Sequence, residues 1–210
     1  MFGLPEETGL KKQIPKSLIY QTFEKTLKGP RKAAFEKDIS RLYVINEIST
    51  NTINIIESKD VKKIFFILVE LKTGEYDDKN IEIILKLFQK NTIAVLSYEG
   101  KYQLAVYNIK LIKSNWEDYF RLQIKGVDLK NVWNNFLIQI GDLDVEKDIT
   151  VDDAIVQAIE KEKIEKQITT LKNKIKKESQ AKKKFELHKE VKRLEKELEE
   201  NYGQDGHANA

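Results

Sequence analysis

The pattern of apolar and polar positions divides the chain into two parts near residue 150. Before that point, short apolar runs alternate with polar turns and carry most of the aromatic residues. Beyond it, apolar residues recur at helical spacing as far as residue 202, without any Pro or Gly. The pattern predicts a globular domain at 1–150, a helical segment at 151–202 and a small, polar, disordered tail at 203–210.

The first part has the pattern of an α+β domain, in which a mixed or antiparallel sheet carries flanking helices. A continuous apolar run at 63–72 is typical of a strand buried on both faces. The expected strands are 41–48, 52–57, 63–72, 92–98 and 102–111. The expected helices are 16–27, 31–39, 77–90 and 129–140.

The helical segment has the spacing of a coiled coil, because its main apolar positions are separated by four, three and four residues. This spacing stops at Glu178 and Lys182 and then starts again. The interruption predicts an antiparallel helical hairpin that turns within 178–184, with Ser179 capping the second helix. The alternative is one continuous rod with a stutter.

The apolar seam of such a hairpin is too small to be stable alone, so we expect it to dock on a protein partner or on a second copy. The expected docking residues are the apolar positions of both helices and one phenylalanine next to the turn. They are Ile164, Ile168, Leu171, Ile175, Phe185, Leu187, Val191, Leu194 and Leu198.

The amino-acid composition excludes several kinds of functional site. The chain has no Cys, which excludes disulfides, thiolate zinc sites and iron–sulfur clusters. The longest apolar run, 64–69, is far too short to cross a bilayer, so we expect a cytoplasmic protein without membrane contact. The chain has 37 Lys and Arg against 34 Asp and Glu, and the net charge of +3 does not by itself indicate nucleic acid binding.

Lysines nevertheless gather around the expected turn. They are Lys176, Lys177, Lys182, Lys183 and Lys184. One interpretation is an ordinary solvated surface. The other is a basic tip that contacts DNA phosphates or an acidic partner.

One short motif has the spacing of a catalytic site. Glu70-Leu71-Lys72 ends the apolar run, and side chains two residues apart emerge on the same face of a strand. Restriction-type nucleases place an acid and a lysine in this way, the acid to hold Mg²⁺ and the lysine to stabilise the phosphate. Glu57 or Asp60 would complete the metal site, although neither stands inside the preceding strand. The structural alternative is a charged pair at an exposed strand end.

Several segments together resemble one family. They are the opening Pro5–Lys16, the stretches 52–55, 61–64 and 70–72, the turn Tyr98–Tyr102, the helix 129–136 and the tail segment Lys183–Val191. On these residues the chain resembles the DUF4391 family over about 1–200. The resemblance implies proteins encoded beside helicases and DNA methyltransferases, in loci like those of restriction or phage-defence systems. It implies no active-site residue.

The sequence therefore leaves alternative functions. The first is a non-catalytic accessory or adaptor subunit that docks through its helical tail onto a helicase or methyltransferase and needs no cofactor. The second is a Mg²⁺-dependent nuclease that uses Glu70 and Lys72. A DNA-binding adaptor working through the turn lysines overlaps the first.

Overall fold

The computed structural model describes residues 2–88, 91–145 and 149–202. These residues form a six-stranded mixed sheet and six α-helices, so the predicted α+β class with a mixed sheet is confirmed. The chain divides into two compact units, the first of which is Met1–Val151 and the second of which begins at Asp152. The predicted tail at 203–210 lies outside the described residues.

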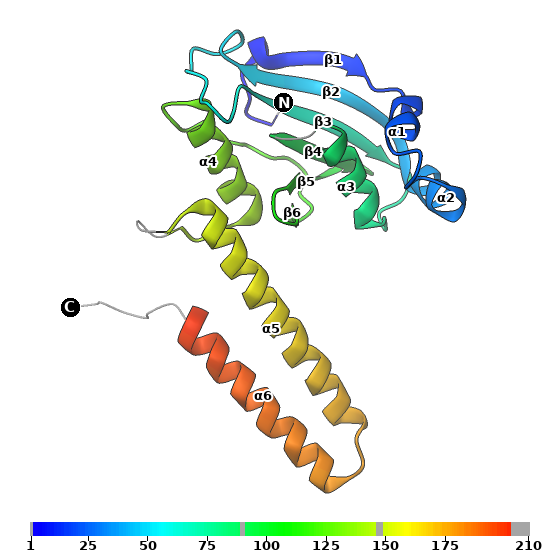
Figure 1. Ribbon diagram of the computed structural model, residues 1–210, viewed down its shortest axis with the longest axis vertical. Coiled ribbons are helices and arrows are strands. Elements are labelled where there is room, and N and C mark those ends of the chain that lie inside the picture. The colour runs from blue at the N-terminus through cyan, green and yellow to red at the C-terminus, as the bar shows by residue number, and fades with distance from the viewer. Residues whose placement is uncertain (1, 89–90, 146–148, 203–210) are drawn as a thin grey trace, which may run out of the picture. The chain divides into compact units, whose positions relative to one another are not determined.

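The sheet belongs to the first unit, and its strands follow one another in space in their chain order (Figure 1). The strands are β1 (Gly9–Gln13), β2 (Ile39–Ser49), β3 (Lys63–Leu71), β4 (Thr92–Tyr98), β5 (Lys101–Tyr107) and β6 (Leu111–Lys113). Neighbours are antiparallel except β3 and β4, which run parallel because α3 (Asp78–Leu87) connects them.

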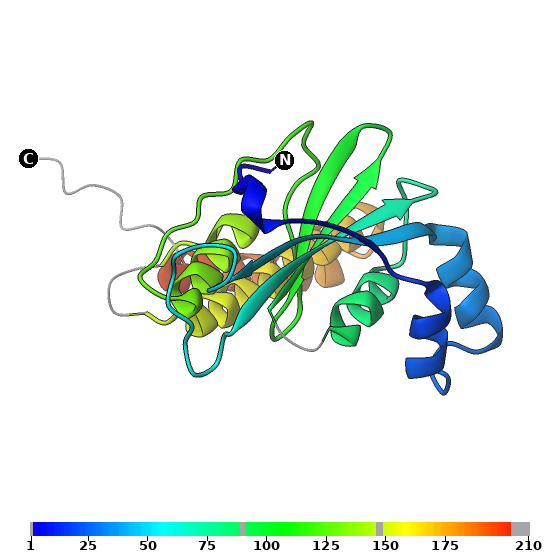
Figure 2. The same ribbon diagram turned by 90° about the horizontal axis from the view of Figure 1, so that it is seen from above.

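The two faces of the sheet carry different helices. On one face Ile67 and Val69 of β3 join a core that includes Ile81 and Ile84 of α3. On the other face Phe66 meets Phe136 of α4 (Leu129–Gly141) edge to face, with ring centroids 5.6 Å apart. Helices α1 (Lys16–Thr22) and α2 (Gly29–Asp38) lie together near the end of the sheet where β2 begins (Figure 2). Both faces of β3 are therefore covered, as its apolar run predicts.

The predicted strand at 52–57 is wrong. After β2 the chain forms a turn in which the backbone N–H groups of Thr52 and Ile53 both donate to the Ser49 carbonyl at 3.1 Å. The only pairing of this segment in the described residues is a single bridge between Ile56 and Asp128. Because β2 and β3 pair directly along their length, no position for a strand remains between them.

Two other strands differ from the prediction. The first strand, β1, was not predicted, because all five of its side chains are exposed and it shows no apolar alternation. The predicted strand at 102–111 consists of two strands, β5 and β6. The chain reverses between them, where Asn108 N–H donates to the Lys110 carbonyl at 3.1 Å.

The second unit consists of two long helices, α5 (Val151–Lys177) and α6 (Ala181–Tyr202), which lie side by side (Figure 1). The helix is interrupted at 178–180, so the continuous rod is not formed. In place of the expected Ser179 cap, Oε1 of Glu178 accepts a hydrogen bond from Gln180 N–H at 2.8 Å. No helix in the described part of the chain is both long and apolar enough to span a membrane.

Candidate functional site

The candidate catalytic motif lies at the end of β3, where Glu70 and Leu71 are within the strand and Lys72 follows it. Glu70 is half-buried and stands in register between Arg41 of β2 and Ser97 of β4. It shares a sheet face with Phe66, four residues earlier, so it lies on the face that carries α4. This placement brings a carboxylate, a guanidinium and a hydroxyl into one row across three strands.

Lys72 does not join this row, because β3 ends at Leu71. The backbone N–H of Lys72 donates to the Asp38 carbonyl at 2.8 Å, and its Nζ donates to the Glu36 carbonyl at 2.6 Å. Both acceptors belong to the last turn of α2, where helix carbonyls have no partner within the helix. The lysine thus satisfies the end of a helix, which is a structural role.

The other predicted metal ligands lie far from Glu70. Glu57 and Asp60 are exposed residues that precede β3, and Asp60 Oδ2 lies 3.7 Å from Lys130 Nζ of α4. Glu70 stands near the opposite end of the strand, and the run from Lys63 to Glu70 spans roughly 23 Å at the usual rise of an extended chain. In the parts of the chain that the structure describes, no three acidic or histidine side chains come close enough together to hold a metal ion.

A buried polar network that the sequence did not indicate lies next to Lys72. Asp38, only 5% exposed, accepts hydrogen bonds through Oδ2 from Asn80 Nδ2 at 2.7 Å and from Asp77 N–H at 2.8 Å. The backbone N–H of Lys79 lowers the pKa of Asp77, and Arg31 acts in the same direction. The network joins the end of α2 to the start of α3, and its only sequence signal is the polar start of that helix at Asp77.

A second polar group holds α1 against α2. Glu36 accepts hydrogen bonds from the Tyr20 hydroxyl and from Lys16 Nζ, the latter at 2.9 Å. These two bonds hold the pKa of Glu36 below its ordinary value, and Lys72 adds to the effect. Burial raises the pKa of Tyr20, and Glu36 raises it further. Every one of these polar atoms is used to join helices.

In the second unit, most of the predicted docking residues pack against one another. Five of them are 4–9% exposed and form one cluster, against which the half-buried Leu171, Leu187 and Leu198 also pack. The buried members are Ile164, Ile168, Ile175, Val191 and Leu194. Phe185 is not part of this cluster and is 72% exposed. The seam between the helices is therefore closed mainly by the helices themselves.

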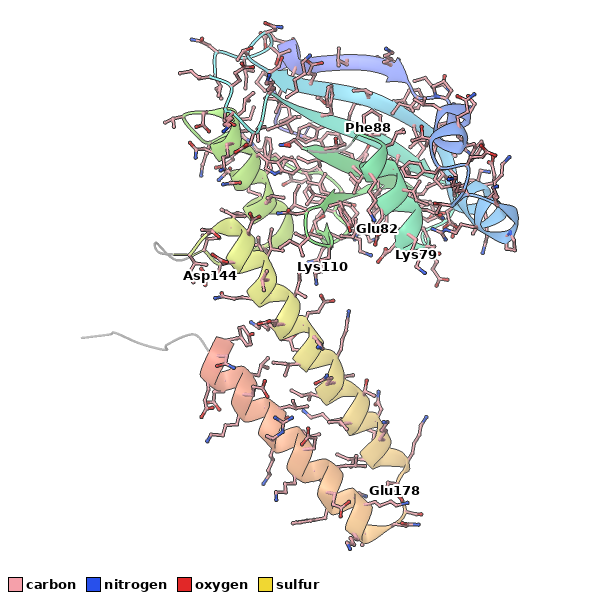
Figure 3. The ribbon with its side chains drawn as sticks, in the orientation of Figure 1. Lys79, Glu82, Phe88, Lys110, Asp144 and Glu178 are labelled. Atoms are coloured by element: carbon pink, nitrogen blue, oxygen red, sulfur yellow. The ribbon has the colours of Figure 1, made fainter. Side chains whose placement is uncertain are left out.

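The charges of the helical unit are unevenly distributed. We define the tip as residues 174–189 and the root as 152–173 together with 190–202. The tip contains seven Lys and two Glu, a net charge of +5, whereas the root contains seven Lys and Arg against ten Asp and Glu, a net charge of −3. Glu178 marks the tip in Figure 3.

Ion pairing follows the same division. In the root, Lys166 pairs with Glu162, Lys172 with Glu195, and Lys196 with Glu200, at N–O distances of 2.5, 2.7 and 3.2 Å. Arg193 also pairs with two root glutamates. In the tip, all of whose residues the structure describes, no lysine lies in an ion pair. The tip thus has a net positive charge that no ion pair of its lysines neutralises, whereas the net charge of the root is negative.

The fold and the site together define an α+β protein with a separate helical unit, in which no catalytic centre of the predicted composition comes together among the described residues. The chain belongs to the family described as Domain of unknown function (DUF4391), whose family model matches residues 2–198. No curated protein and no solved structure matches the chain.

Proposed function

We propose that this protein is a non-catalytic accessory subunit that docks onto a protein partner through α5 and α6. The partner that fits the family resemblance is a helicase or DNA methyltransferase subunit of a restriction or phage-defence system. The observation that carries the proposal is the construction of the second unit. It is a compact unit of two helices with a small apolar core of five buried residues, against which three leucines pack that are only half-buried.

The two helices have the pattern of an antiparallel coiled coil. Two contacts support this arrangement, because Lys172 pairs with Glu195 at 2.7 Å and the Tyr202 hydroxyl donates to Glu160 at 3.1 Å. Late residues of α6 thus lie beside early residues of α5. Matching the seam positions in reverse order opposes Ile164 to Leu198, Ile168 to Leu194, Leu171 to Val191 and Ile175 to Leu187. In an antiparallel coiled coil such layers of two apolar residues form the whole core.

A pair of helices with so few layers would gain stability from a third surface. Leu171, Leu187 and Leu198 remain half-buried, so apolar area is still available along the seam. In the root, a hollow of about 380 Å³ is lined mostly by polar and charged side chains, together with Ile164, Leu194 and Tyr202. An amphipathic helix of a partner fits such a groove, because its apolar face covers the seam and its flanks meet the charges.

Co-purification with a helicase or DNA methyltransferase subunit, the kind of partner named in the proposal, tests it. We expect the full chain to be retained by the partner and the chain ending at Val151 to be lost. Circular dichroism and thermal unfolding must first show that the shortened chain keeps its fold. Retention of the shortened chain would place the docking surface in the first unit and contradict the proposal.

A matched variant of the first unit serves as the control. Glu70→Gln changes a half-buried side chain of the sheet and leaves α5 and α6 unchanged. We expect this variant to bind the partner as tightly as the unaltered chain. Sedimentation of the protein alone shows whether a second copy occupies the groove instead. A dimer that dissociates when the partner is added would support a shared surface, whereas a dimer that persists would contradict docking at this groove.

A further inference from the structure

The tip of the helical unit differs from the root in one property that its fold does not require. Exposed ion pairs contribute little stability, so the absence of pairs at the tip costs the fold little, but it leaves positive charge available. All seven tip lysines are exposed. They are Lys174, Lys176, Lys177, Lys182, Lys183, Lys184 and Lys189.

The two acidic residues of the tip do not cancel this charge. The Glu178 carboxylate accepts a hydrogen bond from the backbone N–H of Gln180. Glu186 forms no ion pair in this fully described segment. A hollow of about 580 Å³ is lined by Lys174 and Lys177 of α5 and Lys183 of α6, together with Glu178, Glu186 and Leu187. Lysines from both helices therefore border one hollow, and over the whole tip they outnumber the two glutamates by five.

We infer that this tip contacts the phosphate backbone of double-stranded DNA. Lysines neutralise phosphates without reading the sequence, and duplex DNA presents about one negative charge per 1.7 Å of its axis. Single-stranded nucleic acid is bound mainly by stacking on several aromatic side chains. The tip has Phe185 as its only Phe, Tyr or Trp, and its charge is carried by lysine alone, so a duplex is the better match.

The inference concerns a second ligand and does not depend on docking to a protein. Its experiment uses the full chain alone with a fluorescent DNA duplex of arbitrary sequence, so that loss of DNA binding and loss of partner binding are separate results. We expect the logarithm of the binding constant to fall linearly with the logarithm of the salt concentration, with a slope of about −0.9 for each phosphate contacted.

A triple variant at the tip, Lys182→Ala, Lys183→Ala and Lys184→Ala, tests the location. We expect its affinity to fall on the order of tenfold or more at low salt, and the slope to become less steep by about 2.7, which is three contacts at 0.9 each. Alanine is a strong helix former, so α6 should persist, and its circular dichroism checks this.

The matched control removes three exposed lysines of the root, through Lys161→Ala, Lys163→Ala and Lys192→Ala. It lowers the net charge of the chain by the same amount, and we expect less than a twofold change in affinity, with the slope retained. Equal losses in the two triple variants would show that charge acts diffusely and would overturn the assignment to the tip. Binding without salt dependence would also overturn it.

Two further measurements separate DNA from the other occupants of a basic surface. Phe185→Ala should leave the salt slope unchanged, and loss of binding in this variant alone would replace phosphate contact by stacking or apolar contact. Polyglutamate serves as an acidic protein surrogate. We expect the duplex to compete more strongly than polyglutamate at equal charge concentration, and the reverse order would assign the tip to an acidic protein instead of DNA.

Discussion

The two units of this protein differ in how completely their core side chains are buried. In the first unit, Phe35, Phe66 and Phe136 are completely buried, and β3 is covered on both faces. In the second unit, the cluster between the helices is made of residues that are all 4–9% exposed. A core with fully desolvated aromatic side chains holds one arrangement, whereas a single seam between two helices can open and close at small cost. The helical unit is therefore the part of the molecule whose stability a partner can change most.

The largest effect should come from the core of the first unit. We expect Phe66→Ala to reduce the free energy of unfolding by about 3–5 kcal/mol, because it removes a fully buried ring and its edge-to-face contact with Phe136. Denaturant unfolding followed by circular dichroism measures the change. Tyr119→Ala, at a side chain that is 78% exposed, is the control and should change the value by less than about 0.5 kcal/mol. Similar losses in both variants would contradict the buried position of Phe66.

A smaller and more local effect is expected in the seam of the second unit. Ile168→Ala should cost about 2 kcal/mol, near the lower end for such a truncation, because the side chain is still 7% exposed. Hydrogen exchange should show faster exchange in α5 and α6 with protection of β3 unchanged. Thr169→Ala, at the neighbouring exposed position, is the matched control. Loss of protection in β3 to the same extent would show that the two units unfold together.

The regular elements could be predicted where a residue pattern reflects burial. The helix α3 buries Ile81, Ile84 and Leu85 at helical spacing, and β3 is a continuous apolar run, so both patterns were sufficient. The edge strand β1 has five exposed side chains and is held by backbone pairing to β2, for which the sequence has no pattern. At 52–57 the β-branched residues suggested a strand, but their first members form the turn that ends β2.

The candidate sites, too, could be predicted only where a local sequence pattern determines which side chains lie close together. The spacing of Glu70 and Lys72 places two side chains on one face only while the strand continues, and β3 ends between them. What Lys72 contacts instead, the last turn of α2, is far away in the sequence and could not be read from a local pattern. Five of the seven tip lysines were noted from the sequence because they lie in or next to the expected turn, and their contact with nucleic acid stays a prediction. They are Lys176, Lys177, Lys182, Lys183 and Lys184.

Acid should affect the contact between α1 and α2. The pKa of Glu36 is lowered in the folded protein from its ordinary value of 4.5, so its bonds to Tyr20 and Lys16 stabilise the fold fully above that pH. This contribution is lost as the pH falls through the lowered pKa. Its size should stay below about 1 kcal/mol, because the Glu36 side chain is 43% exposed and solvent screens it.

The comparison of Glu36→Gln with the unaltered protein over a pH series checks this assignment. The difference in the free energy of unfolding should be largest at neutral pH. It should shrink as the pH falls from 4.5 through the lowered pKa, where the carboxyl of the folded protein becomes neutral as well. Glu24→Gln, at an exposed glutamate of the same region, is the control and should show no such dependence. A difference that grows toward acid would contradict a lowered pKa at Glu36.

The smallest effects are expected at the end of β3. Lys72→Met removes the hydrogen bond to the Glu36 carbonyl and should cost about 0.5 kcal/mol, the usual value for an exposed cation at a helix end. Glu70→Gln should leave the free energy of unfolding almost unchanged, because the Glu70 carboxylate has no ion pair among the described residues.

Mg²⁺ at a concentration of a hundred times its Kd would add about 2.7 kcal/mol to the free energy of unfolding, which thermal unfolding detects easily. We expect no such gain, because Glu57 and Asp60 precede the strand whose other end carries Glu70. Stabilisation by Mg²⁺ that disappears in Glu70→Gln would contradict this conclusion, because it would require a second metal ligand close to Glu70.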